Sequence, residues 1–255
     1  TGADEFTLSH KAEVNKREME STLYFGKSDK SDMYFFNKYD TRVKNERDEM
    51  MAQTFYINKG WGVTLKEAYN LLNGRAVYKE LSSKEGEKYH AWIQLDFSAK
   101  DKHGNYERKQ FHENYGYDLK EALSYYFIRE MGKEEDMKNL VRSLERGNLQ
   151  LVTVQAPGGD VRVFIEANPQ YKTINIYDNK MIRLGQEKRE ELMKQPDAGE
   201  DKEISQSKGQ EKQKEQGLGT EGQDGKKSIK KGKVNGEENG LVKKNRSSSK
   251  KGLTM

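Results

Sequence analysis

The sequence predicts an α+β fold in which antiparallel strand meanders carry helices on one face. It further predicts an internal duplication of an α-β-β-β unit and a disordered C-terminal tail. The 14 tyrosines, 9 phenylalanines and 2 tryptophans all lie at or before Tyr177, so the rest of the chain lacks the side chains that dominate core burial. Upstream of Tyr177, helical and strand-like patterns alternate, and two of the helical patterns end at a glycine.

The first 33 residues are expected to form an N-terminal extension that contains a helix. Ser9 is a suitable N-cap for this helix. Its apolar positions are sparse and comprise Val14, Met19 and Leu23. We place this segment outside the main α+β domain, which is predicted to span residues 34–184.

The main domain begins with a predicted hairpin. Residues 33–40 and 53–58 are rich in β-forming side chains, and residues 45–48 suit the turn between them. A helix is then predicted from residue 65, because Thr64 and Glu67 have the spacing of a capping box. Its apolar stripe comprises Leu65, Ala68, Tyr69 and Leu72.

Gly74 is predicted to end this helix, because glycine tolerates the positive φ that a C-terminal cap requires. A phosphate-binding loop has the reverse order, in which a glycine-rich loop follows a strand and opens a helix. Three strands are expected after Gly74, at residues 75–81, 89–97 and 106–115. On the second of these, alternation places Trp92 on one face. The opposite face carries Tyr89, Ala91, Ile93, Leu95 and Phe97.

The later half repeats this plan. A short helix is predicted at residues 118–123, with Asp118 and Glu121 as its cap pair. Residues 134–155 are expected to form a helix, a glycine at position 147 and a strand. Two further strands are predicted at residues 161–168 and 172–178. The two units of the duplication are therefore predicted as residues 34–117 and 118–184.

Residues 185–255 are predicted to be disordered, because they are too poor in apolar side chains to offset the entropy of ordering. From residue 226 onward the tail has ten basic and two acidic residues, a net charge of +8, and the rest of the chain has a net charge of −4. A flexible basic arm of this kind can bind DNA or RNA by releasing counterions from phosphates. A tail that only improves solubility remains an alternative. The candidate nucleic-acid-binding residues are Lys226, Lys227, Lys230, Lys231, Lys233, Lys243, Lys244, Arg246, Lys250 and Lys251.

A second set of residues could stack on nucleic-acid bases from a strand surface. This set comprises Tyr106, Arg108, Lys109, Phe111 and Tyr115. Alternation instead divides these residues between two faces of a half-buried strand, with Phe111 buried. We favour this second interpretation.

No catalytic residue, metal site or cofactor is predicted. The chain has no cysteine, which excludes disulfides, thiolate nucleophiles and cysteine-based metal sites. Its four histidines, His10, His90, His103 and His112, do not have the spacing of a zinc-protease helix. The carboxylates Asp96, Glu107 and Glu113 are candidate acid–base groups only if burial shifts their pKa values. No apolar run is long enough for a membrane span, so we expect a cytoplasmic protein without a membrane partner.

Several segments resemble an uncharacterised protein family carried by conjugative and other mobile elements of gut Bacteroidetes. The resemblance covers residues 34–184 and the end of the tail. It rests on "YFFNKYD", "TFYINKGWGVTLKEAYNLLNGRAVYKEL", "YHAWIQLDF", "QFHENYGYDL", "FIEANPQYKTINIYD" and "KKNRSSSKKGLTM". The helix–Gly–strand unit is similar to a domain of unknown function that often occurs in tandem in that family. The resemblance implies a genetic context and assigns no catalytic residues.

From these observations we predict a non-enzymatic accessory protein of a mobile genetic element. Its basic tail would contact nucleic acid or an acidic partner protein, and its α+β module would supply the specificity of binding. The alternative is a protein-interaction or scaffold domain that does not bind nucleic acid. An enzyme would require a pocket in which His90, His112 and carboxylates converge.

Overall fold

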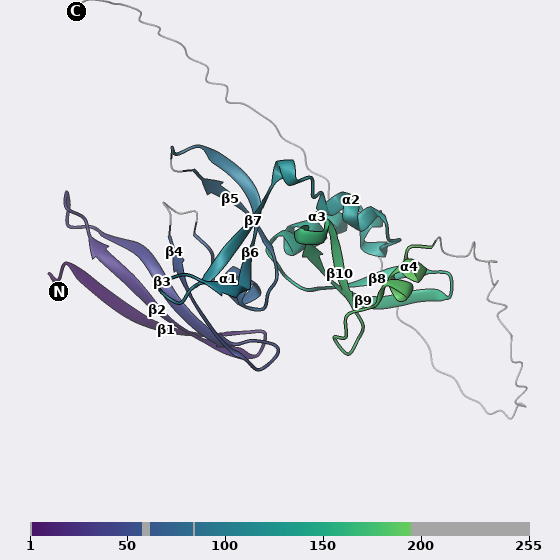
Figure 1. Ribbon diagram of the computed structural model, residues 1–255, viewed down its shortest axis with the longest axis horizontal. Coiled ribbons are helices and arrows are strands. Elements are labelled where there is room, and N and C mark those ends of the chain that lie inside the picture. Colours follow the sequence, from purple (N-terminus) through teal and green to yellow (C-terminus); the bar gives the residue numbers. More distant parts are fainter. Residues whose placement is uncertain (1, 58–61, 84, 195–255) are drawn as a thin grey trace, which may run out of the picture. The chain divides into compact units, whose positions relative to one another are not determined.

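The computed structural model describes residues 2–57, 62–83 and 85–194, and within these ranges the chain forms three antiparallel sheets and four α-helices (Figure 1). The described residues belong to one compact unit. The predicted mixture of antiparallel meanders and helices is therefore confirmed.

The first sheet has the strand order β1-β2-β3-β4. Its strands are β1 (Glu5–Val14), β2 (Arg17–Lys27), β3 (Tyr34–Lys44) and β4 (Met50–Tyr56). The hairpin predicted within residues 33–58 is confirmed as β3 and β4.

The helix predicted within residues 1–33 is wrong, because this segment forms β1 and β2. Asn15 and Lys16 make the turn between them, and both have positive φ values, of 50° and 61°. A two-residue turn of this hand matches the twist of a hairpin. Met19 is fully buried, and β2 pairs with β3, so residue 33 does not mark the boundary of the domain.

The second sheet follows α1 (Leu65–Leu72) and has the order β5-β6-β7. Its strands are β5 (Val77–Ser82), β6 (Lys88–Lys100) and β7 (Tyr106–His112). The predicted capping box is confirmed, because the Thr64 hydroxyl accepts from the Glu67 N–H and the Glu67 carboxylate accepts from the Thr64 N–H. Gly74 has φ of +82° and caps the helix, as predicted.

The third sheet has the order β10-β9-β8 and follows α2 (Leu119–Ser124) and α3 (Glu134–Glu145). Its strands are β8 (Gln150–Ala156), β9 (Gly159–Asn168) and β10 (Thr173–Tyr177). Asp118 caps α2 by accepting from the N–H groups of Lys120 and Glu121. Three short 3₁₀ turns occur at Glu113–Tyr115, Arg129–Gly132 and Pro169–Tyr171.

Helices α1 and α3 are each followed by a three-stranded meander, as predicted. Both helices end in the same hydrogen-bond pattern. The N–H of Arg75 donates to the carbonyl of Asn70, and the N–H of Asn148 donates to the carbonyl of Ser143. The order of elements thus agrees with an α-β-β-β unit that occurs twice, and a duplication of the sequence itself stays a prediction. The predicted unit 34–117 is wrong in its start, because it divides the first sheet between β2 and β3.

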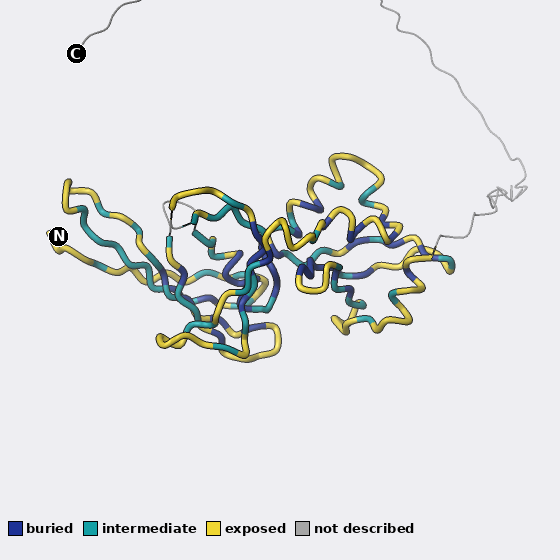
Figure 2. Tube along the Cα trace, turned by 45° about the horizontal axis from the view of Figure 1, so that its top comes forward, coloured by how far each residue is buried: buried dark blue, intermediate teal, exposed yellow. Residues whose placement is uncertain are grey.

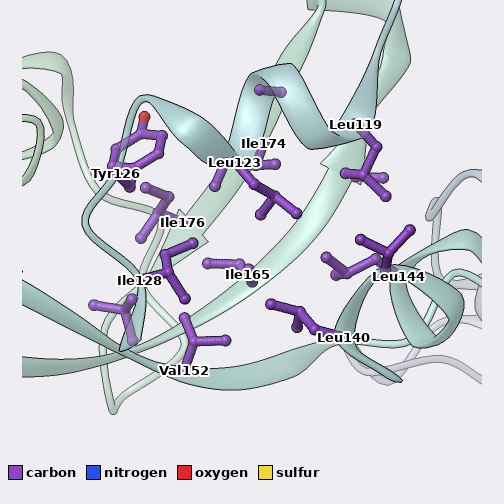
Figure 3. Packing of buried hydrophobic residues seen from close by; sticks show 14 of the residues in the cluster. Leu119, Leu123, Tyr126, Ile128, Leu140, Leu144, Val152, Ile165, Ile174 and Ile176 are labelled. Carbon is purple, nitrogen blue, oxygen red and sulfur yellow. The ribbon is translucent and has the colours of Figure 1, made fainter. Parts of the chain in front are cut away.

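The second sheet lies between two hydrophobic cores. Ile93 and Val77 pack with α1 and the first sheet, where Tyr69 and Met19 are fully buried. Trp92 belongs to the other core, so the predicted alternation along β6 is confirmed. In that core, the leucines of α2 and α3 point onto the inner face of the third sheet (Figure 3).

The predicted disordered tail starts too early in the chain, because α4 (Gln186–Leu192) lies within it. Leu192 is buried in the same core as the third sheet. The guanidinium of Arg189 donates to the Thr173 hydroxyl at 2.8 Å. Leu192 and Arg189 thus contribute to holding this helix against the sheet. Residues 195–255, which include all ten candidate nucleic-acid-binding residues, lie outside the described residues.

Arg75 connects the second sheet with elements far away in the sequence. Arg75 is only 3% exposed. The guanidinium forms ion pairs with Glu46 and with Glu166, and it donates to the Asn70 side-chain oxygen at 3.1 Å. Glu166 also accepts from the Tyr177 hydroxyl at 2.7 Å, and burial together with this proximity raises the pKa of Tyr177. The buried charge of Arg75 is therefore compensated by two carboxylates and one amide oxygen.

Candidate functional site

A groove of about 500 Å³ lies between the Trp92 face of the second sheet and the helices α2 and α3. Its floor is aromatic, because Tyr78, Trp92 and Phe111 are directly opposite one another on β5, β6 and β7. Tyr117 adds a fourth ring, packed edge-on against Trp92 with the centroids 5.4 Å apart. We call this feature the acidic–aromatic groove. Its carboxylates are Glu113, Asp118, Glu121 and Glu145.

The rings of the floor support one another. Tyr78 lies 5.3 Å from Trp92 and stacks on His90 at 5.5 Å, measured between ring centroids. The Tyr78 hydroxyl donates to Glu113 at 3.3 Å. Burial, followed by the charge of Glu113, raises the pKa of Tyr78, so this hydroxyl stays protonated and remains a donor. The floor is therefore held in place before any ligand binds.

Glu145 is the most unusual side chain of the groove. It is the last residue of α3, where the helix dipole disfavours a negative charge. Burial raises the pKa of its carboxyl group, and Lys120, Arg142 and His90 offset this effect only through space. Within the described part of the chain, the Glu145 carboxylate has no hydrogen bond and no ion pair. A half-buried carboxylate without a hydrogen bond or a close ion pair is a typical feature of a binding site.

The chemistry of the groove favours a cation. Four carboxylates line it, and Lys120 is the one lysine or arginine among the described residues that line it. Aromatic faces and carboxylates together attract ammonium and guanidinium groups. The geometry thus suits a lysine or arginine side chain better than a phosphate or a carboxylate ligand.

The two histidines considered for catalysis do not converge, although His112 and four carboxylates line the groove. Ala91 is paired with His112, so His112 lies on the opposite face of the sheet from His90. His112 stacks on Tyr89, whereas His90 stacks on Tyr78. Hydrogen bonds from Ser98 and Lys109 lower the pKa of Asp96 to about 2, which keeps it ionised and unsuited to donate a proton.

The other candidate acid–base and metal-binding groups are scattered. Glu107 lies opposite Asp96 on β7, and Glu113 accepts from Tyr78 at the rim of the groove. His10 and His103 both line a pocket of about 640 Å³ between the first sheet and the turn that joins β6 to β7. Among the described residues, no three histidine or acidic side chains are grouped closely enough to hold a metal ion.

The aromatic and basic residues near β7 do not form one surface. Phe111 is buried and Lys109 is paired with Asp96, as the half-buried interpretation predicts. Tyr106 packs edge-on against Phe97, and its backbone is bound by the Gln53 side chain. Of this set, Phe111 alone lines the groove, because Tyr115 lies outside it and packs beside Phe111.

Comparison of the chain with protein-family models, with curated proteins and with solved structures finds no match in any of the three. The resemblance to a family of mobile elements therefore stays a prediction. Within residues 2–57, 62–83 and 85–194, none of the helices has the length and apolar character needed to cross a bilayer.

Glu145 and Tyr78 were not among the residues predicted to form a site. A signal for Glu145 is present, because an acidic residue in the last turn before the Gly147 cap opposes the helix dipole. Tyr78 had no such signal, since a tyrosine in a half-buried strand is ordinary. Its role depends on α2 and α3 covering that face of the sheet, which local sequence does not reveal.

Proposed function

We propose that this protein is a non-enzymatic binding module whose acidic–aromatic groove receives a lysine- or arginine-bearing segment of a partner protein. The observation that carries this proposal is the half-buried Glu145 carboxylate, which has no hydrogen bond or close ion pair among the described residues and lies beside a floor of aromatic rings. A bound cation would neutralise this charge at the end of the helix. The predicted context is an accessory or scaffold role in a mobile genetic element, as the family resemblance implies.

The direct test is binding of a fluorescein-labelled peptide of alternating lysine and glycine to the full chain, followed by fluorescence anisotropy. Glu145→Gln keeps the size of the side chain and removes the charge. We expect its affinity for the peptide to be roughly tenfold lower than that of the unmodified protein. Glu135→Gln is the matched control, because Glu135 is exposed on the same helix and does not line the groove. Equal affinities for the two variants would contradict the proposal.

The stability of the Glu145→Gln variant shows whether Glu145 serves to bind a ligand or to stabilise the fold. Because the pKa of Glu145 is raised above 4.5 in the folded state, this group stabilises the fold below pH 4.5. That contribution is lost as the pH rises through the folded-state pKa. We therefore expect Glu145→Gln to be at least as stable as the unmodified protein at pH 7. Its advantage should disappear below pH 4.5, as measured by urea denaturation at both pH values.

A second candidate function is nucleic-acid binding through the basic tail, favoured by the charge of +8 after residue 225. Removal of residues 226–255 is expected to weaken binding to a short DNA duplex in a salt series. The slope of log K against log salt should become shallower by about 0.9 for each phosphate that the tail neutralises. Glu145→Gln should leave this binding unchanged. Equal affinities and slopes with and without residues 226–255 would remove the nucleic-acid candidate.

A further inference from the structure

The first sheet has one covered edge and one open edge. At the β4 edge, the Gln53 side chain binds the backbone of Tyr106, and the Thr54 N–H donates to Asn105 at 2.9 Å. These contacts satisfy backbone groups that would otherwise be free. At the other edge, β1 pairs with β2 alone among the described strands (Figure 1). Figure 2 shows that β1 is exposed along most of its length.

The register of β1 defines which of its backbone groups face outward. Lys27 donates its N–H to the Asp4 carbonyl, and this pair continues in register into the β1–β2 ladder. In an antiparallel ladder, backbone groups alternate between the two sides of a strand. The odd-numbered residues of β1 therefore direct their N–H and C=O groups away from β2. These residues are Glu5, Thr7, Ser9, Lys11 and Glu13.

An apolar row crosses the sheet and ends abruptly at this open edge. Leu8 is opposite Leu23, which is opposite Tyr39, which in turn is opposite Phe55. Tyr39 and Phe55 are buried, whereas Leu8 is 50% exposed. Next to this row, Phe6 stacks on Phe25 with the ring centroids 4.9 Å apart. A further strand beside β1 would continue both of these surfaces.

We propose that the partner at this edge is a second copy of the same chain, with the two β1 strands paired antiparallel about a two-fold axis at Leu8. In this register, Glu5 lies opposite Lys11 of the second copy, and Thr7 lies opposite Ser9. Both of these pairs consist of residues whose backbone groups face outward, as a ladder requires. The two leucine side chains meet on the axis and join the two apolar rows into one.

Charge selects this register over the one centred on Thr7, which would pair Glu5 with Ser9 in place of Lys11, and over the one centred on Ser9. Centring the axis on Ser9 instead would place Glu5 opposite Glu13 of the second copy, at both ends of the ladder. Like charges directly opposite each other destabilise a strand pair, and opposite charges stabilise it. All of these registers keep the core side of both sheets on the same face, because a two-fold axis perpendicular to the sheet does not exchange its faces.

The mass of the full chain in sedimentation equilibrium tests the dimer. We expect a mass of twice 29.5 kDa that falls toward 29.5 kDa on dilution. Thr7→Pro removes an outward N–H without removing a bond to β2, and it should raise the dissociation constant of the dimer about 30-fold or more. Thr7→Ala keeps the N–H and should remain a dimer.

A charge reversal tests the register. Lys11 also pairs with Glu20 at 2.7 Å and with Glu18 at 3.3 Å within its own sheet, so it is left unchanged. Glu5→Lys places lysine opposite Lys11 of the second copy and should give a monomer, whereas Glu13→Lys, at a position opposite Ala3 in this register, should remain a dimer. Thermal melting of each variant shows whether it is folded. A monomeric mass for the unmodified chain over the whole concentration range would overturn the proposal. So would a dimer that Thr7→Pro leaves intact, because the contact would then lie elsewhere.

Discussion

Gly147→Ala is expected to lower the free energy of unfolding by roughly 2–5 kcal/mol, whereas Gly74→Ala should lower it by about 1–2 kcal/mol. Both glycines cap a helix with φ near +80°, at +75° and +82°. An alanine at either position bears the penalty of the left-handed conformation. Both variants therefore lose the stability that the left-handed conformation costs an alanine. The difference between their free energies of unfolding measures a second effect, which is present only at Gly147.

The second cost at Gly147 is close packing. A Cβ atom there would lie 2.9 Å from the carbonyl oxygen of Ala76 and 2.9 Å from a methyl group of Val77. The Ala76 oxygen is backbone at the start of the second sheet, so it cannot move without shifting β5. At Gly74, the nearest atom to an added Cβ is on the ring of Phe97 at 3.4 Å, which is an ordinary contact.

Urea denaturation of the two alanine variants, side by side with the unmodified chain, gives both free energies. The junction around Gly147 also includes Asn70, whose side-chain amide donates to the Arg146 carbonyl at 2.8 Å. The ends of α1 and α3 are thus bound to each other directly. Equal losses of stability in the two variants would show that close packing around Gly147 does not add to the cost of an alanine there.

Arg75→Met is expected to destabilise the protein by about 3–5 kcal/mol, because it leaves the carboxylate of Glu166 buried without its counter-ion. Glu166 is 8% exposed, and its remaining donors, Asn175 and Tyr177, are neutral. Adding Glu166→Gln should recover part of this loss, because it removes the uncompensated charge and retains an acceptor for these donors.

The control for Arg75 is Arg129→Ala. Arg129 forms an ion pair with Asp160, but the side chains are 60% and 42% exposed, so its removal should change the stability by no more than about 1 kcal/mol. Chemical denaturation of all three variants distinguishes a buried pair from a surface pair. A loss for Arg75→Met no larger than that for Arg129→Ala would show that water screens the Arg75 site.

Local patterns in the sequence were sufficient to predict α1, its caps and the strands of both meanders. Thr64, Glu67 and Gly74 act within one helix, so the signal and its structural effect are adjacent in the chain. The N-terminal hairpin was missed for a local reason as well. Its turn uses Asn15 and Lys16 at positive φ, and lysine is not a residue that normally signals such a turn.

The groove and the Arg75 network were beyond prediction for another reason. Glu46 and Glu166 approach Arg75 from different sheets, and nothing near Arg75 in the sequence indicates a buried position. In the same way, Glu145 and Tyr78 line one groove only because α3 packs against β5. These features depend on contacts between segments that are distant along the chain, which periodicity and capping rules do not describe.

The position of the second sheet between two cores has a thermodynamic consequence. Ile93 and Trp92 are neighbours on one strand, yet each anchors a different set of buried side chains. Melting either set would expose one face of the strand on which the other set packs, so loss of one core should destabilise the other. The whole described region should thus unfold in one cooperative step, although its sheets hydrogen-bond separately.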